Sequence, residues 1–264
     1  MLSSDFSKNR KGIPLLFMLL TTENFKNKNK AEFALKIIVL DTEIVAFAIN
    51  SKSKEIEAFD KVGSIADIGF KQFTFSDVQV IIIDKQFTLV PESIFNEENA
   101  ASYLNFSTET IEDCSIIISK NKQFSLNTIW YLKNALKNNI IQYWPGSTFT
   151  HLIACKLENI SENHENHTLF VDALKGSLSI LLFTNQELQI ANQFDTNGDE
   201  DALYYLLLTR EQLNLKADNI QVILSGTASF KTKMDKYFSN IILSPSYKCD
   251  LNTTEEDKVI CSII

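Results

Sequence analysis

Two short turns hold the residue types that could bind a phosphate group. Residues 172–177 read DALKGS and combine an aspartate, a lysine and a glycine, while residues 225–228 read SGTA. Glycine lets backbone N–H groups come close to phosphate oxygens, so each turn is at most a partial nucleotide site. The candidate cofactor-binding residues are therefore Asp172, Lys175, Gly176 and Gly226.

Three aspartates stand at the ends of predicted strands. A ribonuclease-H-type nuclease needs clustered carboxylates around two metal ions. Asp41 and Asp172 fall in different halves of the chain, and Asp84 lies in an inserted hairpin, so we expect no such cluster. Acids at strand ends are usually solvated turn residues. Nuclease chemistry is therefore not predicted.

The histidines do not form a convincing site either. His164 and His167, interleaved with Glu162 and Glu165, occupy a polar connector. Three-residue spacing brings two ligands to one face only on a helix, so we interpret this stretch as a solvated loop and predict no metal site. His151 is the only other histidine, and the chain has neither a GxSxG motif nor a P-loop. We therefore expect no nucleophilic triad and no catalytic residue.

The second half of the chain has the clearer pattern of elements. Residues 168–247 are predicted to run strand, strand, strand, helix, strand, helix, strand. The first helix should be capped by Thr196 or Asn197, and acidic residues 199–201 suit its N-terminus. Asn192 shares a predicted strand face with apolar neighbours, so we expect it to point inward. The predicted strands are 168–173, 178–184, 187–194, 221–224 and 241–243, and the second helix is 230–238.

Residues 32–159 are predicted to follow the same order with an insertion. Residues 78–84 and 87–91 form the expected inserted hairpin, and residues 114–119 a strand buried on both faces. The other predicted strands are 33–40, 43–50, 55–61 and 140–144, and the predicted helices are 97–104, 126–138 and 148–157. Polar residues 161–167 separate the halves. The expected domains are an N-terminal extension at 1–31, a first half at 32–160, and a second half with a C-terminal tail at 161–264.

Three motifs within these elements carry a resemblance to a known family. They are ELQIANQFDTNGDEDALYYLLLTREQLNL at 187–215, LSG at 224–226 and FTLVPESIF at 87–95. Together they resemble an uncharacterised bacterial family, domain of unknown function 3822, over nearly all of the chain beyond residue 31. The resemblance implies an α/β protein with an actin-like ATPase fold, made of two duplicated ribonuclease-H-like halves, similar to pilus-assembly and cell-division actin homologues. It implies no established activity.

An actin-like enzyme wraps phosphate with the turn between the first two strands of each half. In this chain the first such turn, residues 40–43, has no glycine, and Glu43 adds a negative charge that repels phosphate. The second turn keeps only Gly176, and residues 225–228 carry one glycine in place of the usual pair. We therefore predict a degenerate nucleotide site, without ATP or Mg²⁺ as cofactor, in which Asp172 and Gly176 shape a β-turn.

Composition narrows the functional classes. The chain has 264 residues, 45% of them hydrophobic, and a net charge of −8, which repels nucleic acid. No run approaches the roughly 20 apolar residues of a membrane span. The four cysteines are scattered and form no CxxC pair, so a reducing cytoplasm fits best. Residues 8–20 resemble a signal peptide, but Pro14 and the lack of a cleavage site argue against one.

Two functional hypotheses follow. The leading one is a non-catalytic protein of the actin-like fold that binds another, unidentified protein or serves as an assembly scaffold. The alternative is a nucleotide- or metabolite-binding enzyme, of ATPase or kinase type, that uses Asp172, Lys175 and Gly226 in a residual site. Thermal melting with Mg-ATP or Mg-GTP discriminates between them, because a bound ligand raises the melting temperature.

Overall fold

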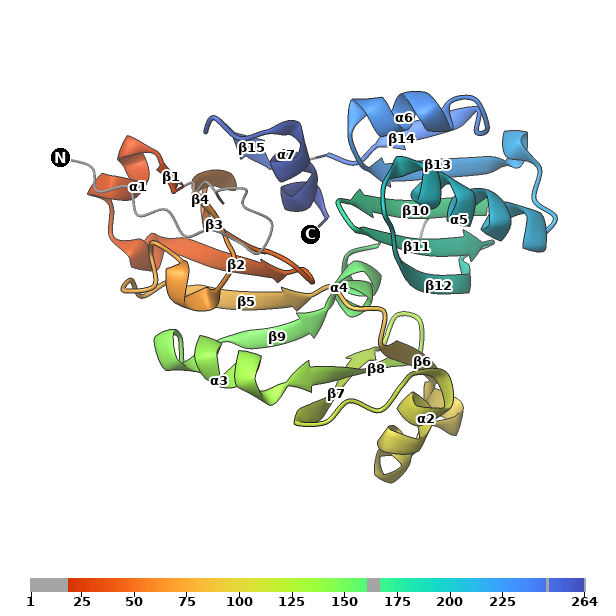
Figure 1. Cartoon of the computed structure of the whole chain (residues 1–264), viewed down its shortest axis with the longest axis horizontal. Helices are drawn as coiled ribbons and strands as arrows, with labels where there is room; N and C mark the ends of the chain where they lie inside the picture. Colours follow the sequence, from red (N-terminus) through yellow and green to blue (C-terminus); the bar gives the residue numbers. More distant parts are fainter. Residues whose placement is uncertain (1–18, 161–166, 246, 264) are drawn as a thin grey trace. The chain divides into compact units, whose positions relative to one another are not determined.

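The computed structural model describes residues 19–160, 167–245 and 247–263, which form two units, each built on its own sheet (Figure 1). The first unit takes residues up to 82 together with 134–149 and 248–252. The second takes residues 83–133, 150–247 and 253 onward. Of the sequence predictions, those on residues 1–18 and on Glu162, His164 and Glu165 lie outside the described residues.

The first sheet begins with the predicted three-strand meander. Its strands β2, β3 and β4 are rich in β-branched and aromatic residues, which favour strands, and β3 is buried at every position. The order across the sheet is β1-β4-β3-β2-β5-β9, with β15 also paired to β4. The strands are β1 Leu20–Thr21, β2 Phe33–Val39, β3 Ile44–Asn50, β4 Glu55–Val62, β5 Asp77–Ile82, β9 Thr148–His151 and β15 Lys248–Cys249.

Two helices belong to the first unit, α1 (Glu23–Asn27) and α3 (Asn134–Tyr143). Residues 19–31, expected to form an extension, contribute β1 and α1 to this unit. Phe25 of α1 is buried and lies edge-on to the ring of Phe33, with centroids 5.1 Å apart. Short 3-10 turns occupy Lys30–Glu32 and Ile65–Asp67.

The second sheet repeats the order of the first. Its order, β12-β11-β10-β13-β14, matches β4-β3-β2-β5-β9 strand for strand, and β13 runs parallel to β10 as β5 runs parallel to β2. The strands are β10 His167–Leu174, β11 Ser177–Thr184, β12 Glu187–Asp195, β13 Ile220–Ser225 and β14 Asn240–Leu243. The second unit also contains helices α4 Leu152–Asn159, α5 Asp199–Gln212, α6 Ala228–Met234 and α7 Glu255–Ser262. The predicted duplication is therefore present.

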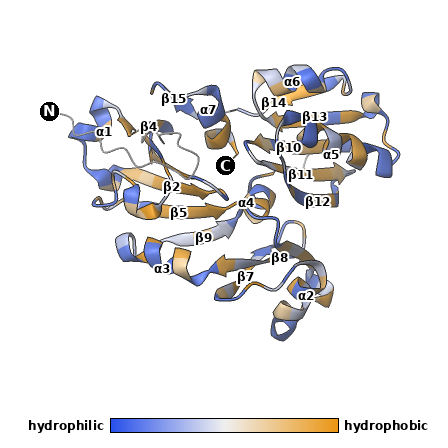
Figure 2. Ribbon diagram, in the orientation of Figure 1, coloured by the Kyte–Doolittle hydropathy of each residue, from blue (hydrophilic) through white to orange (hydrophobic). Residues whose placement is uncertain are grey.

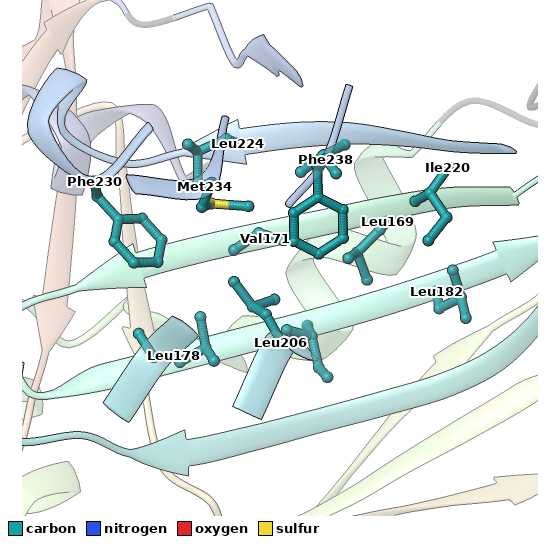
Figure 3. Close-up of a cluster of buried hydrophobic side chains, with 13 residues drawn as sticks. Leu169, Val171, Leu178, Leu182, Leu206, Ile220, Leu224, Phe230, Met234 and Phe238 are labelled. Carbon is teal, nitrogen blue, oxygen red and sulfur yellow. The ribbon is translucent and has the colours of Figure 1, made fainter. Parts of the chain in front are cut away.

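One face of the second sheet packs against α5 and α6. Leu206 of α5 and Phe230 and Met234 of α6 meet alternate side chains of the strands, such as Val171 and Leu224 (Figure 3). All five are almost completely buried. Figure 2 shows β10 and β11 in mostly hydrophobic colours, as expected for central strands covered by helices.

A third, smaller sheet is inserted in the second unit. Its order is β6-β8-β7, formed by β6 Phe87–Pro91, β7 Cys114–Asn121 and β8 Leu126–Lys133. Helix α2 (Ala100–Ser107) packs on it through Leu104, which meets Ile129 and Tyr131. Short 3-10 turns lie at Glu92–Ile94 and Glu97–Asn99, and another lies at Ala217–Asn219 in the second half. None of the helices among the described residues has the length and apolar character needed to cross a bilayer.

The insertion differs from its prediction. The segments expected to pair as a hairpin lie in different sheets, since β5 joins β2 and β6 joins β8. The expected helix at 126–138 is wrong, because residues 126–133 form β8 and only the rest is helical. Apolar residues on both faces of β8, Ile129 toward α2 and Trp130 on the other side, imitated helical spacing. Strand β7 lies at the edge of its sheet and is half-buried, so it is not covered on both faces as predicted.

Residues 134–159 also depart from the prediction. The expected strand at 140–144 is the end of α3, where buried Ile140 and Trp144 fall four residues apart on one face. The expected helix at 148–157 is divided into β9 and α4 at His151. β-branched and aromatic residues at 148–151 favour the strand, and the His151 side chain caps the helix that follows.

Helix α5 and the strand before it were predicted with small errors. The N-cap is Gly198, rather than Thr196 or Asn197. Asn192 is exposed at the edge of the sheet, whereas Gln193 is buried. Asn192 pairs with Ile180 and so shares the face of Ile190, but β12 is the edge strand and this position is not covered. A bulge opposite Leu182 and Phe183 shifts the register of β12 before this point.

Candidate functional site

A row of buried polar residues crosses the second sheet on the face opposite α5 and α6. Gln193 of β12, Ser179 of β11, Asp172 of β10 and Ser225 of β13 are direct neighbours in register. Each is no more than 5% exposed. Asp172 and Ser225 stand near the carboxyl ends of parallel strands, which is the edge where open α/β sheets commonly bind ligands.

The carboxylate of Asp172 is paired with a lysine. The Lys156 Nζ lies 2.7 Å from the Asp172 Oδ1, and the two side chains are only 13% and 5% exposed. Lys156 comes from the last turn of α4, whose N-terminus is capped by the His151 ring. This arrangement neutralises the one acid of the predicted phosphate turn. The ammonium of Lys156 repels a metal cation, and the carboxylate of Asp172 repels a phosphate.

A pocket of about 350 Å³ lies beside this pair. Hydroxyls of three serines and the ion pair stand over an apolar floor, so the pocket can hydrogen-bond a small polar molecule. Among the described residues it offers no histidine or cysteine to act as a base or nucleophile. The lining residues are Lys156, Asn159, Ile160, Phe170, Asp172, Ile223, Ser225, Ser244, Pro245, Ser262 and Ile263.

The other predicted phosphate-binding residues lie at a turn tip or against the core. Lys175 is exposed at the tip of the tight turn between β10 and β11, and Gly176 beside it has a φ of +82°, which favours glycine. At Gly226 a Cβ atom would lie 2.9 Å from the Leu224 Cδ1, so close packing accounts for this glycine. Asp172 and Ser225 are thus brought together, whereas Lys175 lies at the tip of the turn.

The first predicted phosphate turn is acidic in the structure. Asp41 and Thr42 are exposed at its tip, and the Leu40 N–H donates to the Glu43 carbonyl at 3.0 Å. The Glu43 carboxylate lies 3.2 Å from the ammonium of Lys61 on the neighbouring strand β4. The side chain of Glu43 is therefore engaged within its own sheet.

The remaining candidate residues are held by local contacts. Asp84 follows β5, and its carboxylate accepts the Gln86 N–H at 2.9 Å. The Nδ1 of His167 lies 2.9 Å from the hydroxyl of Thr184. Of the two adjacent tyrosines on α5, Tyr205 stacks on Phe194 with centroids 4.2 Å apart, and Tyr204 is exposed.

Sequence reasoning missed Lys156 and Gln193. Lys156 is the only charged residue within LIACKL, the apolar stretch of α4, and a lysine in such a setting needs an acidic partner. Gln193 lies on the face of its strand opposite Asn192, and that face is buried at this position. With its amide oriented to satisfy both groups, it donates to the Asp84 carbonyl at 3.2 Å and accepts the Asp84 N–H at 3.0 Å.

His151 is a buried, neutral histidine beside this region. Its Nε2 donates to the Asp84 carbonyl at 2.7 Å, and its Nδ1 accepts the Ile153 N–H at 3.2 Å. The ring also packs against Phe87, with centroids 4.7 Å apart. Burial lowers the pKa of His151 to about 4, although the bond to Asp84 opposes this shift.

The pH dependence of stability should report this histidine. The pKa is lower in the folded chain, about 4 against 6.5, so the neutral ring stabilises the fold fully above pH 6.5. This contribution, about 3 kcal/mol, should be lost as the pH falls from 6.5 through 4. Urea unfolding across this range tests it. His151→Asn keeps a capping oxygen but cannot titrate, so its curve should lack this component. An unchanged pH dependence would assign the effect to other groups.

Known structures share this architecture. A protein from Bacteroides thetaiotaomicron, described as having an actin-like ATPase fold and unknown function, superimposes with a TM-score of 0.69. It is 16% identical, and the match covers 84% of this chain and 93% of that one. At this identity the likeness establishes the fold alone, which is the predicted actin-like ATPase fold.

More distant matches include the cytoplasmic domain of EpsL, an inner membrane component of the type II secretion system of Vibrio cholerae. It has a TM-score of 0.48 and 10% identity, covering 86% of this chain and 93% of that one. A PilM-PilN type IV pilus biogenesis complex matches with a TM-score of 0.48 and 10% identity, covering 89% and 96%. No curated protein matches the sequence.

The family resemblance carried by the three sequence motifs is confirmed. A family model described as a protein of unknown function, DUF3822, matches residues 24–241. These residues include both meanders, the inserted sheet and the polar row. The chain therefore belongs to the DUF3822 family of proteins of unknown function.

Proposed function

We propose that this protein is a non-catalytic member of the actin-like fold that acts by binding another protein, as a scaffold in an assembly. The observation that carries the proposal is the buried pair of Lys156 and Asp172. Transfer of a phosphoryl group needs a metal ion and several donors aimed at the phosphates. In this chain the acid that could hold the metal is neutralised by a lysine of the same unit.

The two turns support the same proposal. The first has no glycine and presents the carboxylate of Asp41 at its exposed tip, which opposes a phosphate. The second is a tight turn with Lys175 and Gly176 at its tip, and the Gly176 carbonyl accepts the Thr196 N–H at 3.1 Å. Neither turn offers the run of glycine N–H groups that surrounds a polyphosphate.

Nucleotides should leave the melting temperature unchanged. A nucleotide at a hundred times its dissociation constant would stabilise the protein by about 2.7 kcal/mol. For a chain of this length that corresponds to a rise of roughly 5 to 10 °C. We expect a shift below about 1 °C with millimolar Mg-ATP or Mg-GTP, measured by differential scanning fluorimetry. A large shift that Asp172→Asn abolishes would instead establish a residual nucleotide site and overturn the proposal.

We also infer that the protein works in the reducing cytoplasm. None of its four cysteines, all of which lie within the described residues, forms a disulfide. Disulfides are common in secreted proteins and rare where thiols are kept reduced. Fractionation of the native cell tests this inference, and recovery of the protein from the periplasm or the medium would contradict it.

A further inference from the structure

A groove in the second unit lies between two strands that are each at the edge of a sheet. One wall is β6, which ends the small sheet, and the other is β12, which ends the second sheet (Figure 1). The groove has a volume of about 480 Å³. Edge strands carry backbone N–H and C=O groups able to pair with a further strand, and this groove places two such edges opposite each other.

The free edge of β12 has only part of the usual protection, a bulge between Leu188 and Ile190. Its nine residues, 187–195, contain neither lysine nor proline, which commonly block edge-to-edge pairing. The Gln193 N–H is bonded to the Asn192 Oδ1 at 2.9 Å, so it points away from β11. Ala191 lies two residues earlier and shares that direction, because backbone groups alternate along an antiparallel strand. Ala191 also lines the groove, so its N–H faces the groove.

Polar contacts join the two walls at one end of the groove. The Gln193 amide bonds to the backbone of Asp84, and Asp195 forms an ion pair with Lys85, just before β6 begins. Beyond these contacts the walls are lined by apolar side chains, including Leu89 and Leu188. The groove is therefore bounded at one end by polar contacts and lined along its length by both apolar and polar residues.

The segment that runs from β6 into β7 is acidic in sequence. Between residues 86 and 119 the chain has six acids, Glu92, Glu97, Glu98, Glu109, Glu112 and Asp113, and no lysine or arginine. Lys85 is the one basic residue that lines the groove among the described residues. The hydrogen bond and the charge of Asp195 raise the pKa of Lys85, and the charges of Asp84 and Glu109 add to this shift. Three acids therefore lie near this one base. A partner segment carrying lysine or arginine would complement this charge.

We propose that this groove binds an extended, basic segment of a partner protein, which pairs as an added strand with β12. The mode is β-strand addition, in which main-chain hydrogen bonds give affinity and alternate side chains give specificity. This inference rests on the proposed protein-binding function and names the chemistry of the partner. Apolar side chains of the segment would meet Leu89 and Leu188. Its basic side chains would lie near Asp195 and Glu109, which are close to Lys85.

Selection from a random-peptide library on the full-length protein tests the proposal. We expect enriched peptides to alternate apolar and polar residues and to be rich in lysine and arginine. A synthetic peptide of an enriched sequence should slow amide hydrogen exchange in residues 87–91 and 187–192 of the wild-type protein. Ala191→Pro removes an N–H that faces the groove, and should weaken binding at least about tenfold. The matched variant Ala191→Ser keeps the N–H and should bind as the wild type does.

A charge-reversing variant near the groove tests the basic character of the partner segment independently. Glu109→Lys should weaken binding of the same peptide, and the difference from wild type should shrink as salt is raised. Protection of amides elsewhere, or enriched peptides without alternation, would overturn the proposal. So would a concentration-dependent dimer that protects β12 without peptide, because self-pairing would then occupy the edge. Each of these outcomes would overturn the groove proposal but not the proposed protein-binding function. Stabilisation of the protein by Mg-ATP would instead overturn the proposed function.

Discussion

Lys156→Met is expected to destabilise the protein by about 3 to 5 kcal/mol, because it leaves the Asp172 carboxylate buried without its partner. The methionine keeps the length and most of the apolar stem of lysine, so little packing is lost. The measurement is the free energy of unfolding from urea titrations at neutral pH. This loss is comparable to a large part of the ~5 to 15 kcal/mol that stabilises a typical domain.

The double variant Lys156→Met with Asp172→Leu is the matched control. Replacing both members of a buried ion pair by apolar residues is often neutral or stabilising, so it should recover most of the loss. If Lys156→Met alone costs less than about 1 kcal/mol, the pair behaves like an exposed ion pair. The argument that Asp172 is neutralised within the protein would then lose its support.

Phe230→Ala should destabilise the second half by about 3 to 5 kcal/mol, because it opens a cavity in a closely packed core. The Phe230 ring is 1% exposed and projects from α6 into the cluster that contains Leu224 and Met234 (Figure 3). Calorimetric or urea unfolding measures the loss.

The same substitution at an exposed phenylalanine provides the control. The Phe106 side chain on α2 is 95% exposed, so Phe106→Ala should change the free energy of unfolding by no more than about 0.5 kcal/mol. Equal effects at the two positions would contradict the assignment of Phe230 to the core.

The meanders were predictable because their signals are local. Runs of β-branched and aromatic residues separated by short polar turns place β2 to β4 and β10 to β12 almost residue for residue. Residues 126–144 were not predictable in the same way. Ile129, Trp130 and Leu132 fit a helical face and a strand buried on both sides equally well, and only packing against α2 and His151 decides between them.

The candidate site was predictable only in part. Asp172 was identified from its turn, and Gly226 from the glycine that follows a buried strand. The partner of Asp172 was not, because Lys156 is sixteen positions away, in a segment whose boundaries were misplaced. The row from Gln193 to Ser225 depends on the register of four strands, which the bulge in β12 alters and which no local pattern specifies.

The ion pair between α4 and β10 also constrains how this lineage can change. Loss of either member alone passes through a chain that is close to unfolding, while loss of both together requires two rare events. A descendant could regain an unoccupied aspartate for metal binding only by crossing that barrier. The pair therefore makes each single substitution at these two positions costly, although a paired replacement is tolerated.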